Sequence, residues 1–240
     1  DIVLVGDSLG SVLYNYKSTR EVSLNTMIEH SKSVRLGVKK SLMVVDMPHN
    51  TYRNSKEALK NAKQIILKTK CDAVKLEGGK KIISQINYLI KNKISVMGHL
   101  GLLPQTAKGK FKSKGKTEKE KKQLFNDALL LQTSGVFAIV LECIKASTAK
   151  QITQALKIPT IAIVTGAAAG AGFSLALSCD IRIGNLNAFF LSNYSKIGLS
   201  GDYGISWYLA RMLGESKAKE IMFLNERIYS KKAYELGILN

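Results

Sequence analysis

The 240-residue chain is poor in the residues that cross-link a fold or anchor it in a membrane. It has three cysteines, three prolines and one tryptophan. The widely spaced Cys71, Cys143 and Cys179 fit neither a disulfide framework nor a zinc motif, so we expect a reducing, cytoplasmic setting. No apolar run approaches the roughly 20 residues that cross a bilayer, which predicts that no segment spans a membrane. The opening Asp1–Val5 lacks an initiator Met, a basic region and a cleavage site, which is typical of a truncated gene start rather than a signal peptide.

Acidic residues are scarce: 18 Asp and Glu stand against 36 Lys and Arg, a net charge of +18. Residues 158–240 have eight basic and six acidic side chains, so about +16 lies in the first 157 residues. Much of it falls in Lys108–Lys116 and Lys119–Lys122, and such tracts can bind phosphate backbones. The other lysines are scattered at helix-surface spacing with few aromatics between them. We therefore expect a solvated lysine-rich surface rather than a nucleic-acid partner.

Short apolar runs alternate with amphipathic segments over the first two thirds of the chain. The runs predict buried strands at Ile2–Val5, Ser41–Val45, Ala73–Leu76, Ile94–Met97, Phe137–Leu141 and Thr160–Val164. The segments between them predict helices at Leu24–Gly37, Ser55–Thr69, Lys80–Asn92, Thr117–Ser134 and Ala146–Leu156. This alternation is typical of a parallel α/β fold with six β/α units. The lysine-rich stretch 105–116 is expected to be a long βα loop.

Polar side chains follow the predicted strands at the point where each strand ends. Asp7, Asp46, Glu77, His99 and Glu142 follow the first five strands in turn. In a parallel barrel the carboxyl ends of all strands meet at one mouth, so we expect these five side chains to converge. For Asp7 alone, capping of the next helix is an equal alternative.

Three convergent carboxylates without a thiolate cluster favour a hard cation, Mg²⁺ before Zn²⁺. Lys75 stands two positions before Glu77, so strand alternation puts both side chains on one face. An ammonium beside such a metal is suited to holding a substrate carboxylate.

Five ordered motifs carry a resemblance to a known family. They are Val5-Gly-Asp-Ser-Leu-Gly10, Val45-Asp-Met-Pro48, Val74-Lys-Leu-Glu-Gly-Gly79, Gly98-His-Leu-Gly-Leu-Leu-Pro-Gln105 and Val140-Leu-Glu-Cys143. Residues 1–163 thereby resemble ketopantoate hydroxymethyltransferase. The resemblance implies Mg²⁺-dependent transfer of a hydroxymethyl group from 5,10-methylenetetrahydrofolate to 3-methyl-2-oxobutanoate, giving 2-dehydropantoate for pantothenate and coenzyme A synthesis.

The same resemblance assigns roles to particular residues. Mg²⁺ is held at the positions of Asp7, Asp46 and Glu77, and the keto acid is bound around Asp7, Ser8, Asp46 and Lys75. Glu142 is the proton acceptor, and a closed barrel mouth would raise its pKa by desolvation. His99 either orients a neighbouring group or shuttles a proton, or else is a satisfied polar residue. We also expect small-molecule substrates and a homo-oligomer.

The family barrel has eight strands, and two of them have no counterpart among the six predicted here. An open barrel leaves edge strands with unpaired backbone groups. We therefore expect an incomplete TIM-type (β/α)8 barrel of about six units over residues 1–160.

A second resemblance begins at the last of these strands. Ile161–Ile181, Ile197–Gly204 and Arg227–Asn240 resemble the enoyl-CoA hydratase/isomerase (crotonase) family over residues 158–240. It implies a partial α/β segment in which Ala171 supplies a backbone N–H to a coenzyme A thioester and Asp202 shuttles a proton. The positions of the two hydratase glutamates read Ser174 and Tyr194. Close helix packing on small residues, and a loop or cap role for Asp202, are the alternatives.

The change of pattern falls inside a predicted buried strand, with no linker rich in Pro, Gly or Ser. Complete domains are normally joined through such linkers. We therefore interpret the chain as a chimeric fragment with a boundary near residue 160 and a crotonase-like part over 161–240. Three functions stay open: hydroxymethyl transfer, an acyl-CoA hydratase or isomerase, and an inactive chimera.

Overall fold

The computed structural model describes residues 2–107 and 112–240, so the middle of the lysine-rich stretch 105–116 lies outside the described residues. The chain divides into two compact units. The first comprises residues 1–111 and 126–139, and the second comprises residues 112–125 and 140–240. Each unit is described by itself.

The first unit is a run of β/α repeats. Its strands are β1 (Ile2–Val5), β2 (Leu42–Asp46), β3 (Ala73–Glu77) and β4 (Val96–Gly101). Its helices are α1 (Leu9–Leu13), α2 (Leu24–Gly37), α3 (Ser55–Thr69) and α4 (Ile83–Lys91), with 3₁₀ turns η1 (Thr19–Glu21) and η2 (Lys80–Ile82). Two further elements, α5 (Glu118–Thr133) and β5 (Ala138–Glu142), contribute residues to both units.

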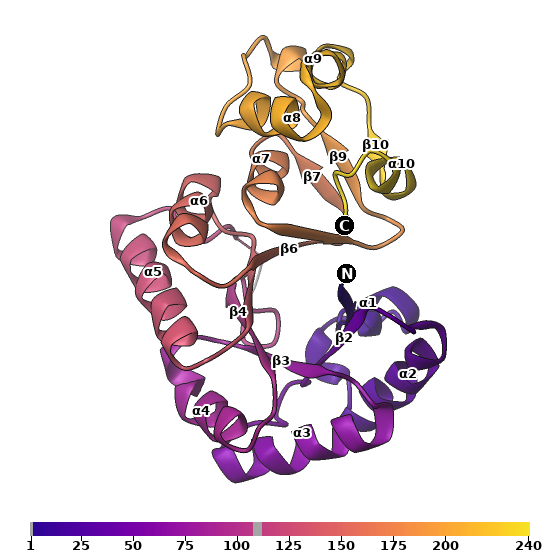
Figure 1. Ribbon diagram of the computed structural model, residues 1–240, viewed down its shortest axis with the longest axis vertical. Helices are drawn as coiled ribbons and strands as arrows, with labels where there is room; N and C mark the ends of the chain where they lie inside the picture. The colour runs from indigo at the N-terminus through magenta and orange to yellow at the C-terminus, as the bar shows by residue number, and fades with distance from the viewer. Residues whose placement is uncertain (1, 108–111) are drawn as a thin grey trace. The chain divides into compact units, whose positions relative to one another are not determined.

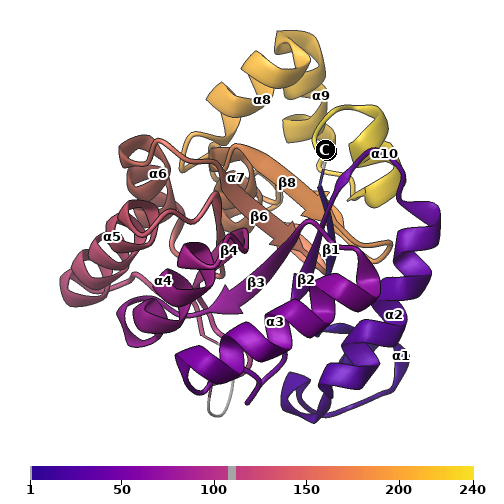
Figure 2. The ribbon, with the colours of Figure 1, turned by 60° about the horizontal axis from the view of Figure 1, so that its bottom comes forward.

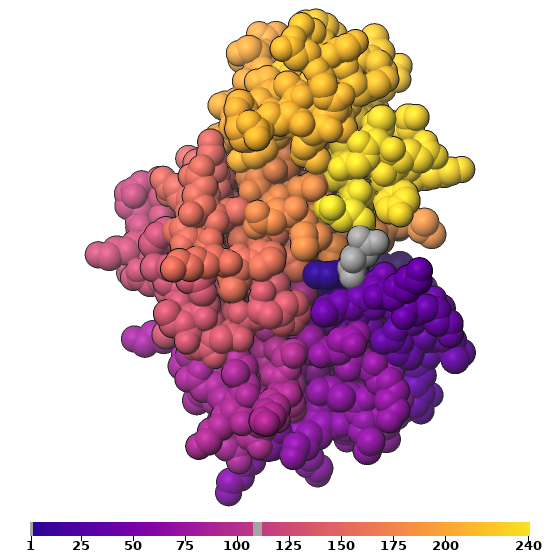
Figure 3. Space-filling view, viewed as in Figure 1, coloured from indigo at the N-terminus to yellow at the C-terminus, as the bar shows by residue number. Residues whose placement is uncertain are grey.

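The four strands of this unit pair in parallel and in chain order. Helices α2, α3 and α4 lie side by side along one face of the sheet, as Figures 1 and 2 show from two directions. In the space-filling view, residues of α3 and α4 form the lower part of the surface of the unit (Figure 3). Since all five residues of β3 are buried, the strand is covered on both faces, as its apolar sequence predicts.

Local signals in the sequence set the ends of the long helices. The Asn54 side chain caps α3 by accepting a hydrogen bond from the Glu57 N–H at 2.9 Å, and Ser23 caps α2 through the N–H of Thr26. Lys70 ends α3 in the left-handed conformation. The α2 and α3 boundaries therefore coincide with the sequence prediction.

The second unit continues the β/α pattern and adds a smaller sheet. Its remaining elements are α6 (Ala146–Ala155), β6 (Thr160–Val164), β7 (Ala167–Ala169), α7 (Ala171–Ser178), β8 (Ile181–Gly184), β9 (Phe189–Leu191), η3 (Ser195–Ile197), α8 (Ile205–Leu213), α9 (Glu215–Leu224), β10 (Ile228–Tyr229) and α10 (Ser230–Glu235). Strand β8 pairs in parallel with β6, while β9 lies between β7 and β10 in the small sheet.

The parallel sheet has seven strands in the described part of the chain, in the order β1-β2-β3-β4-β5-β6-β8. The α/β class is confirmed, and this order is the one in which successive units of a TIM-type barrel are laid down. The prediction of six strands was one short. The four residues Ile181–Gly184 lie in the segment expected to be crotonase-like, yet they form strand β8 and extend the parallel sheet beside β6.

The helices of the described residues include none that is both long enough and apolar enough to cross a membrane.

Candidate active site

Strand register brings the predicted polar residues of the first unit together. Asp46 is the register partner of Lys75 across β2 and β3, and Glu77 is the partner of His99 across β3 and β4. Lys75 and Glu77 are two residues apart in one strand and so share a face. Asp46 and Glu77 are the last residues of their strands and His99 lies within β4, whereas the sequence placed all three after the strands.

A buried ion pair joins two of these residues. Lys75 Nζ lies 2.9 Å from Asp46 Oδ1, and both side chains are almost completely buried. The other Asp46 oxygen, Oδ2, accepts a hydrogen bond from the Asp7 backbone N–H at 3.1 Å. Burial by itself lowers the pKa of Lys75, but the charges of Asp46, Glu77 and Asp7 outweigh it and raise that pKa. Lys75 is therefore a permanent cation among the carboxylates.

Gln105 connects two of the carboxylates from the end of the Gly98–Gln105 motif. Its side-chain Nε2 donates to Asp7 Oδ2 at 2.8 Å, and its backbone N–H donates to Glu77 Oε2 at 3.1 Å. The Tyr52 hydroxyl donates to Gln105 Oε1 at 2.6 Å. Sequence reasoning did not single out Gln105 or Tyr52 as site residues. Gln105 is the last residue of the Gly98–Gln105 motif, and this motif could have identified it as a site residue. No motif in the sequence pointed to Tyr52.

Burial dominates the electrostatics of Glu77. It raises the pKa of this carboxyl to about 8; the Asp7 and Asp46 charges add to the rise, and Lys75 and the Gln105 N–H oppose it. Burial likewise raises the pKa of Tyr52, with the Glu77 charge as the next cause, so this phenol stays a hydrogen-bond donor. The site has more buried negative charge than Lys75 alone compensates, which suits it to a further cation.

His99 faces the same cluster. Its Nδ1 lies 3.1 Å from Lys75 Nζ and 3.7 Å from Glu77 Oε1. Because an ammonium only donates, Nδ1 accepts from Lys75 and the ring proton is on Nε2. This contact is compatible both with a His99 that orients the Lys75 ammonium and with a His99 that is a satisfied polar residue.

Asp7 and Ser8 follow β1. Ser8 is exposed and occupies the N-cap of α1, although its side chain makes no capping hydrogen bond. Asp7 is buried and accepts from Gln105. The N-cap residue of α1 is therefore Ser8, and Asp7 does not have the helix-capping role that the sequence left open for it.

Glu142 is the last residue of β5 and belongs to the second unit. Cys143 follows it with a φ of 51°, so the chain turns sharply there. The N–H of Lys114 donates to the Cys143 carbonyl at 2.8 Å, and the N–H of Lys145 donates to the Lys114 carbonyl at 2.8 Å. Described residues of the basic stretch thus run beside the strand end that carries Glu142.

The crotonase-like candidates lie in the second unit. Ala171 is the first residue of α7, after Gly170. Asp202 is exposed, and its Oδ1 accepts from the N–H of Tyr203 at 2.6 Å, which is the contact expected of a loop carboxylate. The buried Ser174 donates to the Asp202 carbonyl at 3.1 Å and lies 3.3 Å from the Tyr194 hydroxyl. Ser174 and Tyr194 therefore bring two hydroxyl groups together beside the Asp202 carbonyl.

The carboxylates of Asp7, Asp46 and Glu77 are hard oxygen donors of the kind that Mg²⁺ prefers. Within residues 2–107 and 112–240, however, no three His, Cys, Asp or Glu side chains are arranged as a ready-made metal site. Mg²⁺ is usually held by one or two carboxylates together with substrate and water, so this donor set suits it without a complete protein cage.

A family model for ketopantoate hydroxymethyltransferase matches residues 1–211. The chain belongs to the ketopantoate hydroxymethyltransferase family. It is thus an enzyme of the hydroxymethyltransferase type. This match extends beyond residue 163, at which the sequence motifs had predicted that the resemblance to this family ends.

Individual relatives agree with the family model. A 3-methyl-2-oxobutanoate hydroxymethyltransferase of Pelagibacter ubique is 62% identical over 198 residues, which cover 82% of this chain and 76% of the relative. The Rhizobium etli protein of the same name is 44% identical over 204 residues, covering 82% and 74%. The Heliobacterium modesticaldum protein is 47% identical over 169 residues, covering 69% of this chain and 61% of its own length.

Among solved structures, an enoyl-CoA hydratase from Polaromonas sp. JS666 is 29% identical and covers 49% of this chain and 59% of its own. Its TM-score of 0.41 is too low to carry an argument about the fold or activity of the second unit.

Proposed function

We propose that the enzyme transfers a hydroxymethyl group from 5,10-methylenetetrahydrofolate to 3-methyl-2-oxobutanoate, forming 2-dehydropantoate, with Mg²⁺ as cofactor. The observation that carries the proposal is the buried cluster of Asp46, Lys75, Glu77 and His99, which strand register assembles on one face of the parallel sheet. The names of the relatives supply the reaction, and the cluster supplies the chemical groups that it needs.

Asp46 and Asp7 are the proposed anchors of Mg²⁺, with Glu77 beside them. When bound, the metal would supply Lewis-acid polarisation of the keto and carboxylate oxygens of the substrate, which makes its C3 proton easier to remove. The Lys75 ammonium, held by Asp46 and His99, provides a fixed positive charge for the substrate carboxylate. Burial of these groups strengthens such interactions, because water does not screen them.

Glu142 is the proposed base. Its carboxylate takes the C3 proton. Water breaks both carbon–nitrogen bonds of the folate methylene group and leaves its carbon as formaldehyde, and the carbanion forms a carbon–carbon bond to that carbon, whose oxygen takes up a proton and becomes the hydroxyl group. One water is consumed, because the methylene carbon must end as a hydroxymethyl group and tetrahydrofolate is released. Since Glu142 works as a proton acceptor, the Glu142→Gln variant should bind the keto acid yet form no product.

Calorimetric titration of Mg²⁺ in the presence of 3-methyl-2-oxobutanoate tests the proposal directly. Wild-type enzyme should bind the pair, and Asp46→Ala should abolish binding because the metal loses an anchor and Lys75 loses its partner. Asp72→Asn is the matched control, since this exposed carboxylate pairs with Arg35 away from the cluster. Binding of equal strength in wild type and Asp46→Ala would refute the assigned site.

An acyl-CoA activity of the second unit is the alternative, and we propose that it does not include hydration. Ser174 and Tyr194 offer no carboxylate to activate water, and loss of even one oxyanion donor typically costs about 10²–10³ in rate. Incubation with crotonyl-CoA, followed by absorbance of the enoyl thioester, should show no turnover above a no-enzyme control. Turnover that disappears in Asp202→Ala would show the opposite.

A further inference from the structure

Gln105 is the residue through which the loop after β4 reaches the carboxylates. It is 1% exposed, and its side-chain and backbone N–H groups donate to Asp7 and Glu77, as described above. The second hydrogen of Nε2 is used as well, in a bond to the Met47 carbonyl at 3.0 Å. Both amide hydrogens and the amide oxygen of this side chain are therefore engaged.

The surroundings fix the orientation of this amide. A flipped amide would turn Oε1 toward the Asp7 carboxylate and the Met47 carbonyl, two acceptors, and would turn N–H groups toward the Tyr52 hydroxyl. The observed orientation satisfies all three partners. Tyr52 thus holds the Gln105 donors against Asp7.

An amide has a property here that a basic side chain lacks. Lysine or arginine at position 105 would orient Asp7 equally well but would cancel its negative charge and compete with a bound cation. Gln105 donates to the Asp7 carboxylate and adds no charge, whereas the ammonium of the cluster comes from Lys75, which pairs with Asp46.

We propose that Gln105 is a positioning residue of the hydroxymethyltransferase site, which orients Asp7 and Glu77 with uncharged donors so that their charge serves a divalent cation and the keto acid. Tyr52 assists by holding the amide. The inference rests on the proposed function and deepens it, since it explains how the anchors of the cation are held in place.

The backbone of Gln105 is held independently of its side chain. Arg20, in η1, donates from Nε to the Gln105 carbonyl at 2.8 Å and from Nη2 to the Ala107 carbonyl at 2.5 Å. Replacement of the side chain therefore leaves the loop tethered and keeps the N–H bond to Glu77. Gln105→Met, which is close in volume, removes the amide functions alone.

Calorimetry of MgCl₂ binding in the presence of 3-methyl-2-oxobutanoate measures the effect. Gln105→Met removes a hydrogen bond to a charged carboxylate, and such bonds contribute more free energy than bonds between neutral groups. The variant should therefore bind the cation about ten- to hundredfold more weakly. Tyr52→Phe should weaken it less, by about threefold, and the double variant should be no weaker than Gln105→Met, because both act on one amide. In steady-state kinetics the KM for the keto acid should rise by a similar factor.

Gln85→Met is the matched control. Gln85 is also a buried glutamine of the first unit, but its amide donates to the backbone carbonyls of Tyr52 and Arg53 instead of a carboxylate. It should lower thermal stability as Gln105→Met does and leave the affinity unchanged.

Three outcomes overturn this inference. They are wild-type affinity in Gln105→Met, equal weakening in Gln85→Met, and strict additivity of Tyr52→Phe with Gln105→Met. If Gln105→Met does not fold, Tyr52→Phe alone decides, and wild-type affinity in it also overturns the inference. Absence of binding in the wild type would instead refute the proposed function, so the two failures are distinguishable.

Discussion

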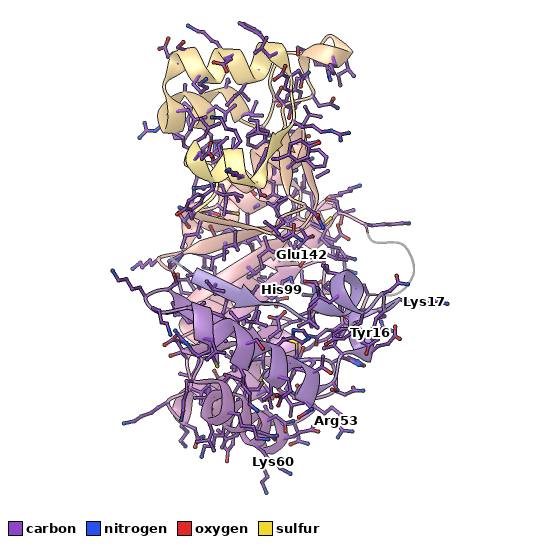
Figure 4. All side chains as sticks on the ribbon, turned by 90° about the vertical axis from the view of Figure 1, so that its right-hand side faces the viewer. Tyr16, Lys17, Arg53, Lys60, His99 and Glu142 are labelled. Atoms are coloured by element: carbon purple, nitrogen blue, oxygen red, sulfur yellow. The ribbon has the colours of Figure 1, made fainter. Side chains whose placement is uncertain are left out.

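Lys75 is a buried ammonium among buried carboxylates, and its neighbours keep it charged. Removal of one partner from such a pair leaves an uncompensated charge, which typically costs about 3–5 kcal/mol. We expect Lys75→Met to lower the free energy of unfolding by about 3 kcal/mol in urea denaturation. Lys60→Met is the control, since Lys60 is an exposed α3 residue that, like Arg53, points away from the unit in Figure 4. Equal loss in both variants would contradict the assigned charge balance.

At the residue scale, the raised pKa of Glu77 predicts that the free energy of unfolding depends on pH. Its pKa in the folded protein is about 8, against about 4.5 for an unperturbed glutamate, so the folded state retains a proton that the unfolded state has lost between these values. Its stabilising contribution is complete below about pH 4.5 and is lost as pH rises to 8, with a slope of at most about 1.4 kcal/mol per pH unit. Denaturation of metal-free protein from pH 5 to 8 should show this loss, and Glu77→Gln should reduce it. A Glu77→Gln curve parallel to that of wild type would show that another group is responsible.

At the scale of elements, the two glycines that end the Val74–Gly79 motif are each required for a different physical reason. Gly78 has a φ of 133°, a conformation that L side chains rarely adopt. A Cβ at Gly79 would lie 2.4 Å from the Asp127 carboxyl carbon and 2.7 Å from its Cβ, so the glycine lets the end of β3 approach α5. The motif is thus required by packing as well as by the chemistry of Lys75 and Glu77.

Gly79→Ala should therefore destabilise the protein by about 1–3 kcal/mol, the usual effect of overpacking. Gly37→Ala is the matched control, because Gly37 lies in α2 with nothing within 4 Å of an added Cβ. Alanine there should stabilise the helix by about 0.5–1 kcal/mol. Thermal unfolding should move the two variants in opposite directions, and a shift of the same sign would contradict the packing argument.

At the scale of the whole molecule, the candidate ligand-holding residues are unevenly distributed between the units. Asp7, Asp46, Lys75 and Glu77 belong to the first unit, while Glu142 belongs to the second. Binding to the native state opposes local opening of the elements that contact the ligand. Mg²⁺ with 3-methyl-2-oxobutanoate should therefore slow amide hydrogen exchange in peptides from β2 and β3 and leave β9 and β10 unchanged. Protection confined to the peptides of β9 and β10 would place the ligand elsewhere.

The sequence by itself determined the local features, because these depend on neighbouring residues. The period of the apolar residues gave the bounds of α2 and α3, and alternation put Lys75 and Glu77 on one face. Five motifs between Val5 and Cys143 indicated the family. The seventh strand was missed, because Arg182 interrupts the apolar run of Ile181–Gly184, whereas the equally short β1 is apolar throughout.

Only the tertiary structure decided which distant residues meet. Strand register pairs Asp46 with Lys75 and Glu77 with His99, and these pairings exist only once neighbouring strands have come together in the sheet. Gln105 lies 98 positions from Asp7 and 53 from Tyr52, so its hydrogen bonds to them exist only once the loop after β4 has folded back. The raised pKa of Glu77 has the same origin, because burial is a property of the packed unit rather than of the residue.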